Sequence, residues 1–280
     1  MFRVINQEEI YKKLVDLIEK VNFSLPEDVE KALLESRKKE EDKNAQIVLD
    51  ILIENAKIAK EKKIPVCQDC GMVVAFVEIG RNLCINGNIE NAINDAVRTV
   101  YVNDFLRKSV VRDPLRRINT EDNTPAVIHY DVVDGDKLRI NILIKGFGSE
   151  NASVVKNLLP TVSREELINE IIEHIKFFGP NACPPLIVGI GIGGTLEKAA
   201  ILSKKALLRP IGKHNDDPFW ASLEDELLEK INNLNIGPGG LGGKTTALAV
   251  NIESYPVHIA GFTLAINLQC CAVRHGWVEI

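Results

Sequence analysis

The residues best suited to chemistry in this 280-residue sequence are six cysteines, at positions 67, 70, 84, 183, 270 and 271. Thiolates bind metal ions and iron-sulfur clusters, whereas disulfide frameworks belong to short secreted chains that are dense in cysteine. Six cysteines spread this widely are few for such a framework. We therefore expect free thiols or thiolate ligands.

Cys67, Cys183 and Cys270 are single thiols from three distant parts of the chain. Cys67 and Cys70 could form a redox pair or half of a zinc site, but no second pair follows at zinc-ribbon spacing. Three separate thiols suit an iron-sulfur cluster that leaves one iron open to substrate. Neighbouring residues of a strand point to opposite faces, so at most one of Cys270 and Cys271 is expected to face the same site.

Two glycine-rich segments are similar to nucleotide-binding motifs. Gly189, Gly191 and Gly194 satisfy G-x-G-x-x-G between an expected strand and an expected helix, but no acidic residue ends a second strand about twenty residues later. Residues 238–245, PGGLGGKT, differ from a P-loop only at the first position, yet a β-rich run follows where a P-loop opens a helix. Both segments thus lack part of the expected context, but a nucleotide-binding protein is kept as an alternative function. A structural subunit that holds zinc or a cluster without catalysis is another alternative.

The elements that must position these residues follow a mixed α/β pattern, with a helical amino-terminal region followed by mixed sheets flanked by helices. Apolar residues at helix spacing predict helices over 7–62, and the apolar run 72–79 predicts a buried strand. Residues 126–133 and 137–145 alternate about Asp134-Gly135-Asp136, which predicts a β-hairpin.

The carboxy-terminal half continues this alternation of helices and β-rich runs. Ser163 and Glu166 predict a capping box for a helix that Gly179 ends. The further elements that we expect are a buried strand over 186–190, helices over 88–106, 195–208 and 217–234, and β-rich runs over 245–252 and 258–268.

Composition limits the classes of function. The formal net charge is −5, and no basic block is long enough to indicate a nucleic-acid or membrane partner. The sequence shows neither a secretory signal nor eighteen consecutive apolar residues, which predicts a cytoplasmic protein. The length allows one large domain or two modest ones. We expect a single domain over 1–280, with 1–62 as its helical region.

Seven motifs, in order and over nearly the whole chain, resemble the alpha (amino-terminal) part of the class I iron-sulfur fumarases and the related tartrate dehydratases. They are IPVCQDCG (64–71), LRKSVVRDPL (106–115), NTPAVIHY (123–130), KGFGSEN (145–151), ACPPLIVGIGIGGT (182–195), GPGGLGGKTTALAV (237–250) and NLQCCAVRH (267–275). The resemblance implies a 4Fe-4S hydro-lyase that reversibly hydrates fumarate to (S)-malate. An L-tartrate dehydratase alpha subunit is the alternative within the family.

The resemblance also implies roles for individual residues. Cys67, Cys183 and Cys270 would hold the cluster, Gln68 and Asp69 would line the pocket beside it, and Arg107 would bind a substrate carboxylate. Gly148 would allow close backbone approach to substrate, and His258 would orient Asp69 or share a proton with it. The sequence departs from the family pattern at Cys70 and Cys271. These extra thiols leave open which member of each pair binds iron.

The partners that the resemblance implies are a small dicarboxylate substrate and a beta subunit, which would supply the catalytic base and further carboxylate-binding residues. We expect this chain alone to carry the cluster and to be active only with that subunit. We also expect alpha subunits to pair with each other, and we expect no nucleic-acid or membrane partner.

Overall fold

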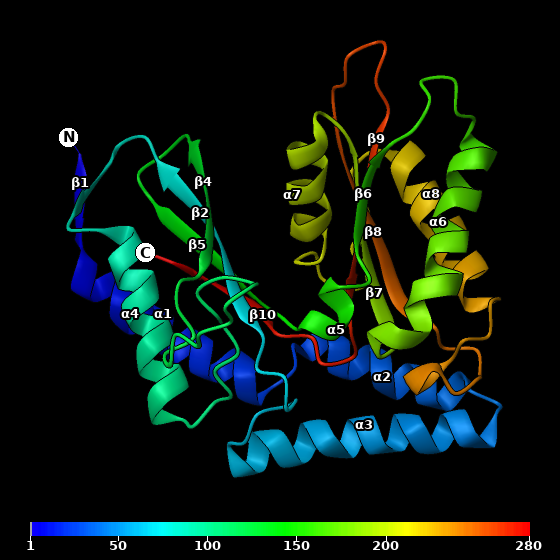
Figure 1. Ribbon diagram of the computed structural model, residues 1–280, viewed down its shortest axis with the longest axis horizontal. Coiled ribbons are helices and arrows are strands. Elements are labelled where there is room, and N and C mark those ends of the chain that lie inside the picture. The colour runs from blue at the N-terminus through cyan, green and yellow to red at the C-terminus, as the bar shows by residue number, and fades with distance from the viewer. Residues whose placement is uncertain (1) are drawn as a thin grey trace. The chain divides into compact units, whose positions relative to one another are not determined.

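The computed structural model describes residues 2–280, and its internal contacts divide the chain into two compact units (Figure 1). The first unit contains the segment up to Pro26, Ala56–Phe147 and Arg274–Ile280, and the second contains Glu27–Asn55 and Gly148–Val273. The chain therefore crosses between the units four times. A single domain over 1–280 stays a prediction, because compactness does not test whether either unit folds alone.

The first unit is built on a four-stranded mixed sheet in the order β10-β5-β2-β4 and a two-stranded parallel sheet of β1 and β3. The central strand β2 pairs parallel with β4 and antiparallel with β5, and β10 pairs antiparallel with β5. The strands span β1 (Arg3–Asn6), β2 (Met72–Gly80), β3 (Leu83–Asn86), β4 (Val127–Val133), β5 (Leu138–Lys145) and β10 (His275–Glu279).

The predicted hairpin of residues 126–133 and 137–145 is wrong, although both strands form. β4 and β5 do not pair with each other, because β2 lies between them and pairs with both. The Asp134-Gly135-Asp136 connection instead crosses the end of β2, where the Gly80 N–H donates to the carbonyl of Lys137 at 2.8 Å. The physical reason is the run from Val73 to Val77, which is buried at every position and needs a strand on either side.

Helices α1 (Gln7–Phe23) and α4 (Ile89–Asn103) pack against each other and complete the core of this unit. Ile10, Leu14 and Ile18 lie one helical turn apart on α1 and are fully buried, together with Ile140 and Ile142 of β5. With α2 (Glu27–Lys39) and α3 (Lys43–Lys62), the helices predicted over 7–62 are confirmed. One of the four boundaries between the units, between Asn55 and Ala56, falls within α3.

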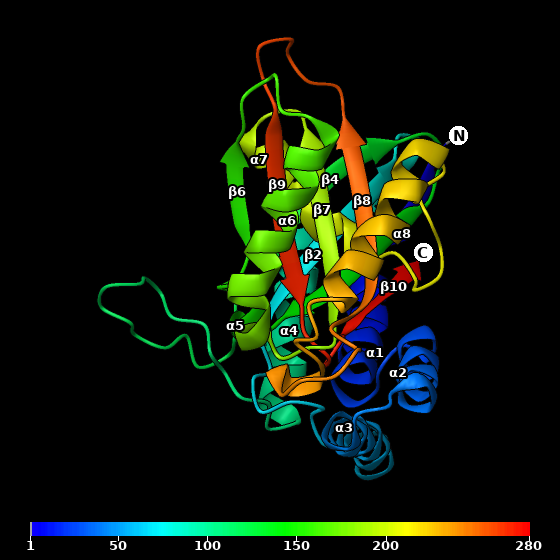
Figure 2. The ribbon, with the colours of Figure 1, turned by 90° about the vertical axis from the view of Figure 1, so that its right-hand side faces the viewer.

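The second unit is a three-layer arrangement around a four-stranded sheet in the order β6-β9-β7-β8 (Figure 2). β7 pairs parallel with β8 and antiparallel with β9. Helix α7 covers one face of the sheet, and α6 and α8 cover the other (Figures 1 and 2). Besides α2 and the first part of α3, its elements are β6 (Val154–Asn157), α6 (Arg164–Phe178), β7 (Leu186–Gly193), α7 (Leu196–Ala206), α8 (Pro218–Asn232), β8 (Ala247–Tyr255) and β9 (Thr263–Gln269).

Short helical turns join these elements: α5 (Phe147–Glu150), η1 (Gly179–Ala182) and η2 (Pro238–Gly240). The capping box of Ser163 and Glu166 is confirmed at the start of α6. The predicted end of this helix near Phe178, with Gly179 after it, is confirmed. Gly179 keeps right-handed helical angles and begins η1. The predicted β-run over 258–268 begins only at Thr263, and β10 has no counterpart in the sequence prediction.

The mixed α/β fold class, with its helical amino-terminal region, is thus confirmed. Among residues 2–280, no helix combines the length and the apolar character needed to cross a membrane.

Candidate functional site

The predicted site residues fall in both units, and the residues of each unit are described separately. The first unit carries Cys67, Gln68, Asp69 and Arg107, and the second carries Gly148, Cys183, His258 and Cys270. In the first unit, Cys67, Gln68 and Asp69 lie on the turn between α3 and β2, with Gln68 exposed and the other two half-buried. The Cys67 thiol contacts the side-chain oxygen of Gln68 at 3.5 Å.

Asp69 is held on this turn through its carboxylate and its carbonyl. Its Oδ1 accepts the Gly71 N–H at 2.9 Å, and its Oδ2 accepts the Phe147 N–H at 2.8 Å. The Asp69 carbonyl accepts a hydrogen bond from Nη1 of Arg274 at 2.7 Å. Three hydrogen bonds, from Gly71, Phe147 and Arg274, therefore fix the orientation of Asp69.

Arg274 is a site residue that the sequence analysis missed. Its side chain is only 1% exposed, and its Nε and Nη2 atoms are buried without a hydrogen-bond partner among the described residues. Nη2 and Asp69 Oδ2 both lie within 3.3 Å of the position that a Cβ on Gly146 would occupy. A buried guanidinium thus stands beside the Asp69 carboxylate. Arg274 lies inside the NLQCCAVRH motif, but nothing local in the sequence indicates its burial.

Cys70 has a structural role in the first unit. Its sulfur accepts the Arg107 N–H at 3.2 Å, its thiol points to the carbonyl of Cys67 at 3.8 Å, and its own carbonyl accepts the Tyr101 hydroxyl at 2.5 Å. Burial raises the pKa of the Cys70 thiol, and the Arg107 N–H only partly offsets this effect. Because a ligand must be a thiolate, Cys67 suits a metal better than Cys70 does.

Alkylation of the metal-free chain is expected to follow this difference. At about pH 7.5, iodoacetamide should modify Cys67 at least about tenfold faster than Cys70, because only the thiolate reacts and a raised pKa keeps Cys70 protonated. Cys70 should react only as the pH rises above the ordinary range of a thiol pKa. Fragment-ion mass spectrometry of the peptide that contains both residues measures the two rates, and equal rates would contradict the structural role of Cys70.

Arg107 is exposed, and the backbone around it is anchored to the same turn. Asn123 is fully buried, and its side-chain oxygen accepts the N–H groups of Ser109 and Val110 at 2.8 and 3.2 Å. Its amide nitrogen donates to the carbonyl of Gly71 at 3.0 Å. Asn123 therefore ties the Arg107 segment to the Cys67 turn. Asn123 begins the NTPAVIHY motif, but no local sequence signal indicates this role.

In the second unit, the segments that bear Cys183 and Cys270 meet at one end of the sheet. Cys183 precedes β7 and Cys270 follows β9, and the antiparallel pairing of these strands places the two cysteines at the same end. The Cys271 N–H donates to the carbonyl of Cys183 at 3.1 Å. Cys183 is exposed and has φ of 55°, a left-handed conformation that is costly outside glycine and that clusters at functional sites.

His258 lies at the opposite end of this sheet, in the connection between β8 and β9. β8 ends at Tyr255 beside Gly193, the last residue of β7, so the length of β7 separates His258 from Cys183 within the second unit. The exposed His258 ring accepts the Ala260 N–H at Nδ1. Its interaction with Asp69 stays a prediction. Gly148 is exposed, and a Cβ on it would meet no described atom within 4 Å.

The G-x-G-x-x-G segment has a packing role. A Cβ on Gly189 would lie 2.1 Å from the carbonyl oxygen of Ser203, and one on Gly191 would lie 2.0 Å from that of Ala199. Both glycines belong to β7 and let α7 pack directly on the strand backbone. Within the second unit, β7 separates Gly193 and Gly194 from Cys183.

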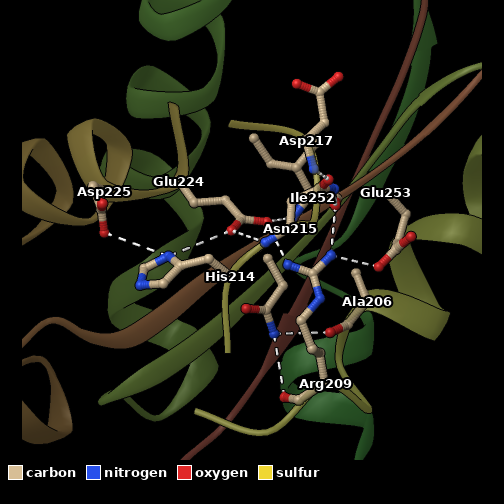
Figure 3. A network of polar contacts seen from close by, with 10 residues as sticks. Ala206, Arg209, His214, Asn215, Asp217, Glu224, Asp225, Ile252 and Glu253 are labelled. Carbon is tan, nitrogen blue, oxygen red and sulfur yellow. Dashed lines mark hydrogen bonds and ion pairs between the residues drawn. The ribbon is translucent and has the colours of Figure 1, made fainter. Parts of the chain in front are cut away.

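The segment where a dinucleotide site would need its acidic residue is held by an internal polar network (Figure 3). Arg209 donates to the carboxylates of Glu224 and Glu253 and to the carbonyl of Ile252. Glu224, which is 2% exposed, also accepts the backbone N–H of Asn215 at 3.0 Å. These contacts fix the α7–α8 connection and its neighbouring strand, so the acidic groups already have partners within the chain.

The P-loop-like segment also binds an internal group. The backbone N–H groups of Lys244 and Thr245, which would point at a phosphate in a P-loop, donate to the buried carboxylate of Glu40 at 2.9 and 3.2 Å. Strand β8 follows this segment, as predicted, in place of a helix. Neither glycine-rich segment therefore has the geometry of a nucleotide site.

Comparison with known proteins agrees with the motifs. The family model described as "Fumarate hydratase (Fumerase)" matches residues 11–279. A protein of Methanocaldococcus jannaschii named "Putative L(+)-tartrate dehydratase subunit alpha" is 43% identical over 270 residues, which is 93% of this chain and 94% of the relative. A protein of Escherichia coli (strain UTI89) named "L(+)-tartrate dehydratase subunit alpha" is 32% identical over 285 residues, 98% of this chain and 93% of the relative. This chain belongs to the fumarate hydratase (Fumerase) family.

Proposed function

We propose that this chain is the alpha subunit of an iron-sulfur hydro-lyase that adds water to fumarate to give (S)-malate and removes it in the reverse direction. The observation that carries the proposal is the meeting of the Cys183 and Cys270 segments at one end of the sheet, with Cys183 exposed in a left-handed conformation. The match of residues 11–279 to the fumarate hydratase family supports it.

We propose a 4Fe-4S cluster with three protein ligands, and the accessibility of the cysteines supports this proposal. Cys67, Cys183 and Cys270 are each at least partly accessible, whereas Cys70 is buried and engaged with the Arg107 backbone. We assign Cys67, Cys183 and Cys270 as the ligands. When bound, such a cluster supplies a Lewis-acidic iron that makes the hydroxyl of a 2-hydroxy dicarboxylate easier to expel.

Three residues of the first unit, Arg107, Asp69 and Gln68, would bind and orient the substrate. The planar guanidinium of Arg107 can pair with a substrate carboxylate through two parallel hydrogen bonds. Each oxygen of Asp69 accepts one backbone N–H and keeps a further acceptor position, with which Asp69 would hold the proton of the substrate hydroxyl. Gln68 is exposed beside it and would line the pocket.

Removal of the carbon-bound proton would depend on the predicted beta subunit. We propose that a beta subunit supplies the base that removes the carbon-bound proton, and the names of the two relatives as alpha subunits support such a partner. Pairing of alpha subunits, cytoplasmic location and the absence of nucleic-acid or membrane partners stay predictions.

L(+)-tartrate is the second candidate substrate, because the relatives at 43% and 32% identity carry tartrate dehydratase names. Both candidate reactions need the same roles from this chain, because each involves a four-carbon dicarboxylate and a leaving hydroxyl. These roles are binding of a carboxylate and orientation of the hydroxyl. The two candidates are distinguished by assaying the anaerobic complex of alpha and beta subunits with fumarate, L-malate and L(+)-tartrate.

Iron and sulfide analysis after anaerobic reconstitution tests the ligand assignment. Cys67→Ser, Cys183→Ser and Cys270→Ser are each expected to retain less than about a fifth of the iron of the unmodified chain, because a cluster with three protein ligands is poorly held by two. Hydro-lyase activity of the complex with the beta subunit should fall in parallel.

Cys84→Ser is the matched control, because Cys84 is exposed on β3 and belongs to none of the motifs. Cys70→Ser and Cys271→Ser should also keep their iron. Full retention in any of the three ligand variants would remove that residue from the ligand set. A chain that binds no iron at all would contradict the proposed function.

A further inference from the structure

Glu40, between α2 and α3, is a buried carboxylate with an unusual number of partners. It is 3% exposed, and its Oε1 accepts the N–H groups of Glu41 and Asp42 at 3.1 and 3.2 Å. Its Oε2 accepts the N–H groups of Lys244 and Thr245 and the hydroxyl of Thr245, at 2.9, 3.2 and 3.3 Å. One side chain thus joins the start of α3 to a loop two hundred residues later, and each oxygen serves one of the two segments.

The loop is shaped to approach this carboxylate closely. A Cβ on Gly243 would lie 2.4 Å from the Cβ of Ala45 on α3 and 3.1 Å from Glu40 Oε2. Any larger residue at this position would push the loop away from Glu40. The same loop, residues 237–245, contains the glycines that are similar to a P-loop, so their small size serves an internal contact.

The other side of the loop supports Cys183. The Gly239 N–H donates to the carbonyl of Pro184 at 2.8 Å, and a Cβ on Gly240 would lie 2.9 Å from the carbonyl oxygen of Pro180. The loop therefore contacts the chain on both sides of Cys183. The Cys183 carbonyl in turn accepts the Cys271 N–H at 3.1 Å.

We propose that Glu40 is a positioning residue for the cluster ligands Cys183 and Cys270, acting through residues 237–245. The N–H groups of Lys244 and Thr245 donate to Glu40, the Gly239 N–H donates to the Pro184 carbonyl, and the Cys271 N–H donates to the Cys183 carbonyl. All of these residues belong to the second unit. A left-handed conformation outside glycine persists only where the surrounding structure holds it. The contacts of residues 237–245 with the chain on both sides of Cys183 provide such a support.

Glu40→Gln in the full chain tests the proposal, because a glutamine has a single side-chain oxygen. This oxygen can accept the N–H groups at the start of α3 or those of the loop, but not both. The side-chain NH₂ group then faces the other pair of N–H groups, with which it cannot form hydrogen bonds because both are donors. Hydrogen exchange followed by mass spectrometry should show exchange at least about tenfold faster for the amides of Lys244 and Thr245, and also for those of Gly239 and Cys271, which do not touch Glu40. A purely local role would change only the first pair.

Glu41→Gln is the matched control, because Glu41 is exposed and pairs only with the side chain of Lys244 among the described charges. It should leave exchange at Gly239 and Cys271 unchanged. After reconstitution, Glu40→Gln should lose at least about half of its iron relative to Glu41→Gln.

Unchanged exchange at Gly239 and Cys271 in a folded Glu40→Gln chain would overturn the inference. If that variant does not fold, as judged by circular dichroism, Glu40→Asp replaces it, since the shorter carboxylate keeps the charge but cannot reach both segments. The ligand role of Cys183 rests on the proposed function. The exchange measurement uses the metal-free chain, so it decides the support of Cys183 even if no form of the protein binds iron.

Discussion

Arg274→Met is expected to lower the hydro-lyase activity of the alpha–beta complex at least about a hundredfold while changing the free energy of unfolding by less than about 1 kcal/mol. The buried Arg274 guanidinium makes one hydrogen bond, to the Asp69 carbonyl, and leaves Nε and Nη2 without partners among the described residues. Unsatisfied buried donors cost about 1–3 kcal/mol each, and removing them offsets the lost bond. The fold should therefore tolerate methionine.

Activity should not tolerate it, because the bond to Asp69 fixes the turn that carries Cys67 and Gln68. Urea unfolding and activity assays measure the two effects, and the alkylation rate of Cys67 in the metal-free chain reports on the turn without any partner subunit. Arg139→Met is the control. Arg139 lies on β5 of the same unit, where its guanidinium stacks over Trp277 at 4.3 Å, and its loss should leave activity unchanged. A folded, fully active Arg274→Met complex would show that Asp69 needs no such support.

Gly191→Ala is expected to destabilise the second unit by at least about 3 kcal/mol, the upper range of the cost of overpacking a core. The new Cβ would lie 2.0 Å from the Ala199 carbonyl oxygen and 2.7 Å from the Ser203 nitrogen. Both atoms belong to the backbone of α7, so the whole helix must move. Separation of α7 from β7 would disturb the sheet that carries Cys183 and Cys270 at its end.

Urea denaturation followed by circular dichroism measures this effect. Gly148→Ala is the matched control for stability, because a Cβ there would meet no described atom within 4 Å and its backbone is not left-handed. It should change the free energy of unfolding by less than about 0.5 kcal/mol. Equal stabilities of the two variants would contradict the close packing of α7 on β7.

The sequence predicted local elements well because their signals are local. The capping box of Ser163 and Glu166 and the continuous apolar run of β2 each depend on residues within a few positions, and both are confirmed. The pairing of β4 and β5 was predicted wrongly from an equally clear local signal. A turn of the Asp-Gly type shows where the chain reverses, but only the burial of β2 decides that a third strand enters between the two arms.

The candidate site shows the same limit. Family motifs placed the cysteines, Asp69 and Arg107, but the supports of these residues are not neighbours in sequence. Arg274 reaches the Asp69 carbonyl across 205 positions, and Glu40 reaches Lys244 across 204. Such side-chain to backbone bonds depend on tertiary structure, and a single sequence carries no pattern for them.

The division of the chain into two units has a consequence for biosynthesis. Residues 274–280 supply β10, which pairs with β5, and the Leu138 N–H donates to the Ile280 carbonyl at 3.0 Å. On a ribosome, β5 therefore emerges long before its edge partner, with the main body of the second unit translated in between. At ordinary elongation rates this delay is on the order of 10 s. The nascent first unit must keep the β10 edge of β5 unpaired for that time, and an unpaired strand edge is a ready template for pairing with another chain.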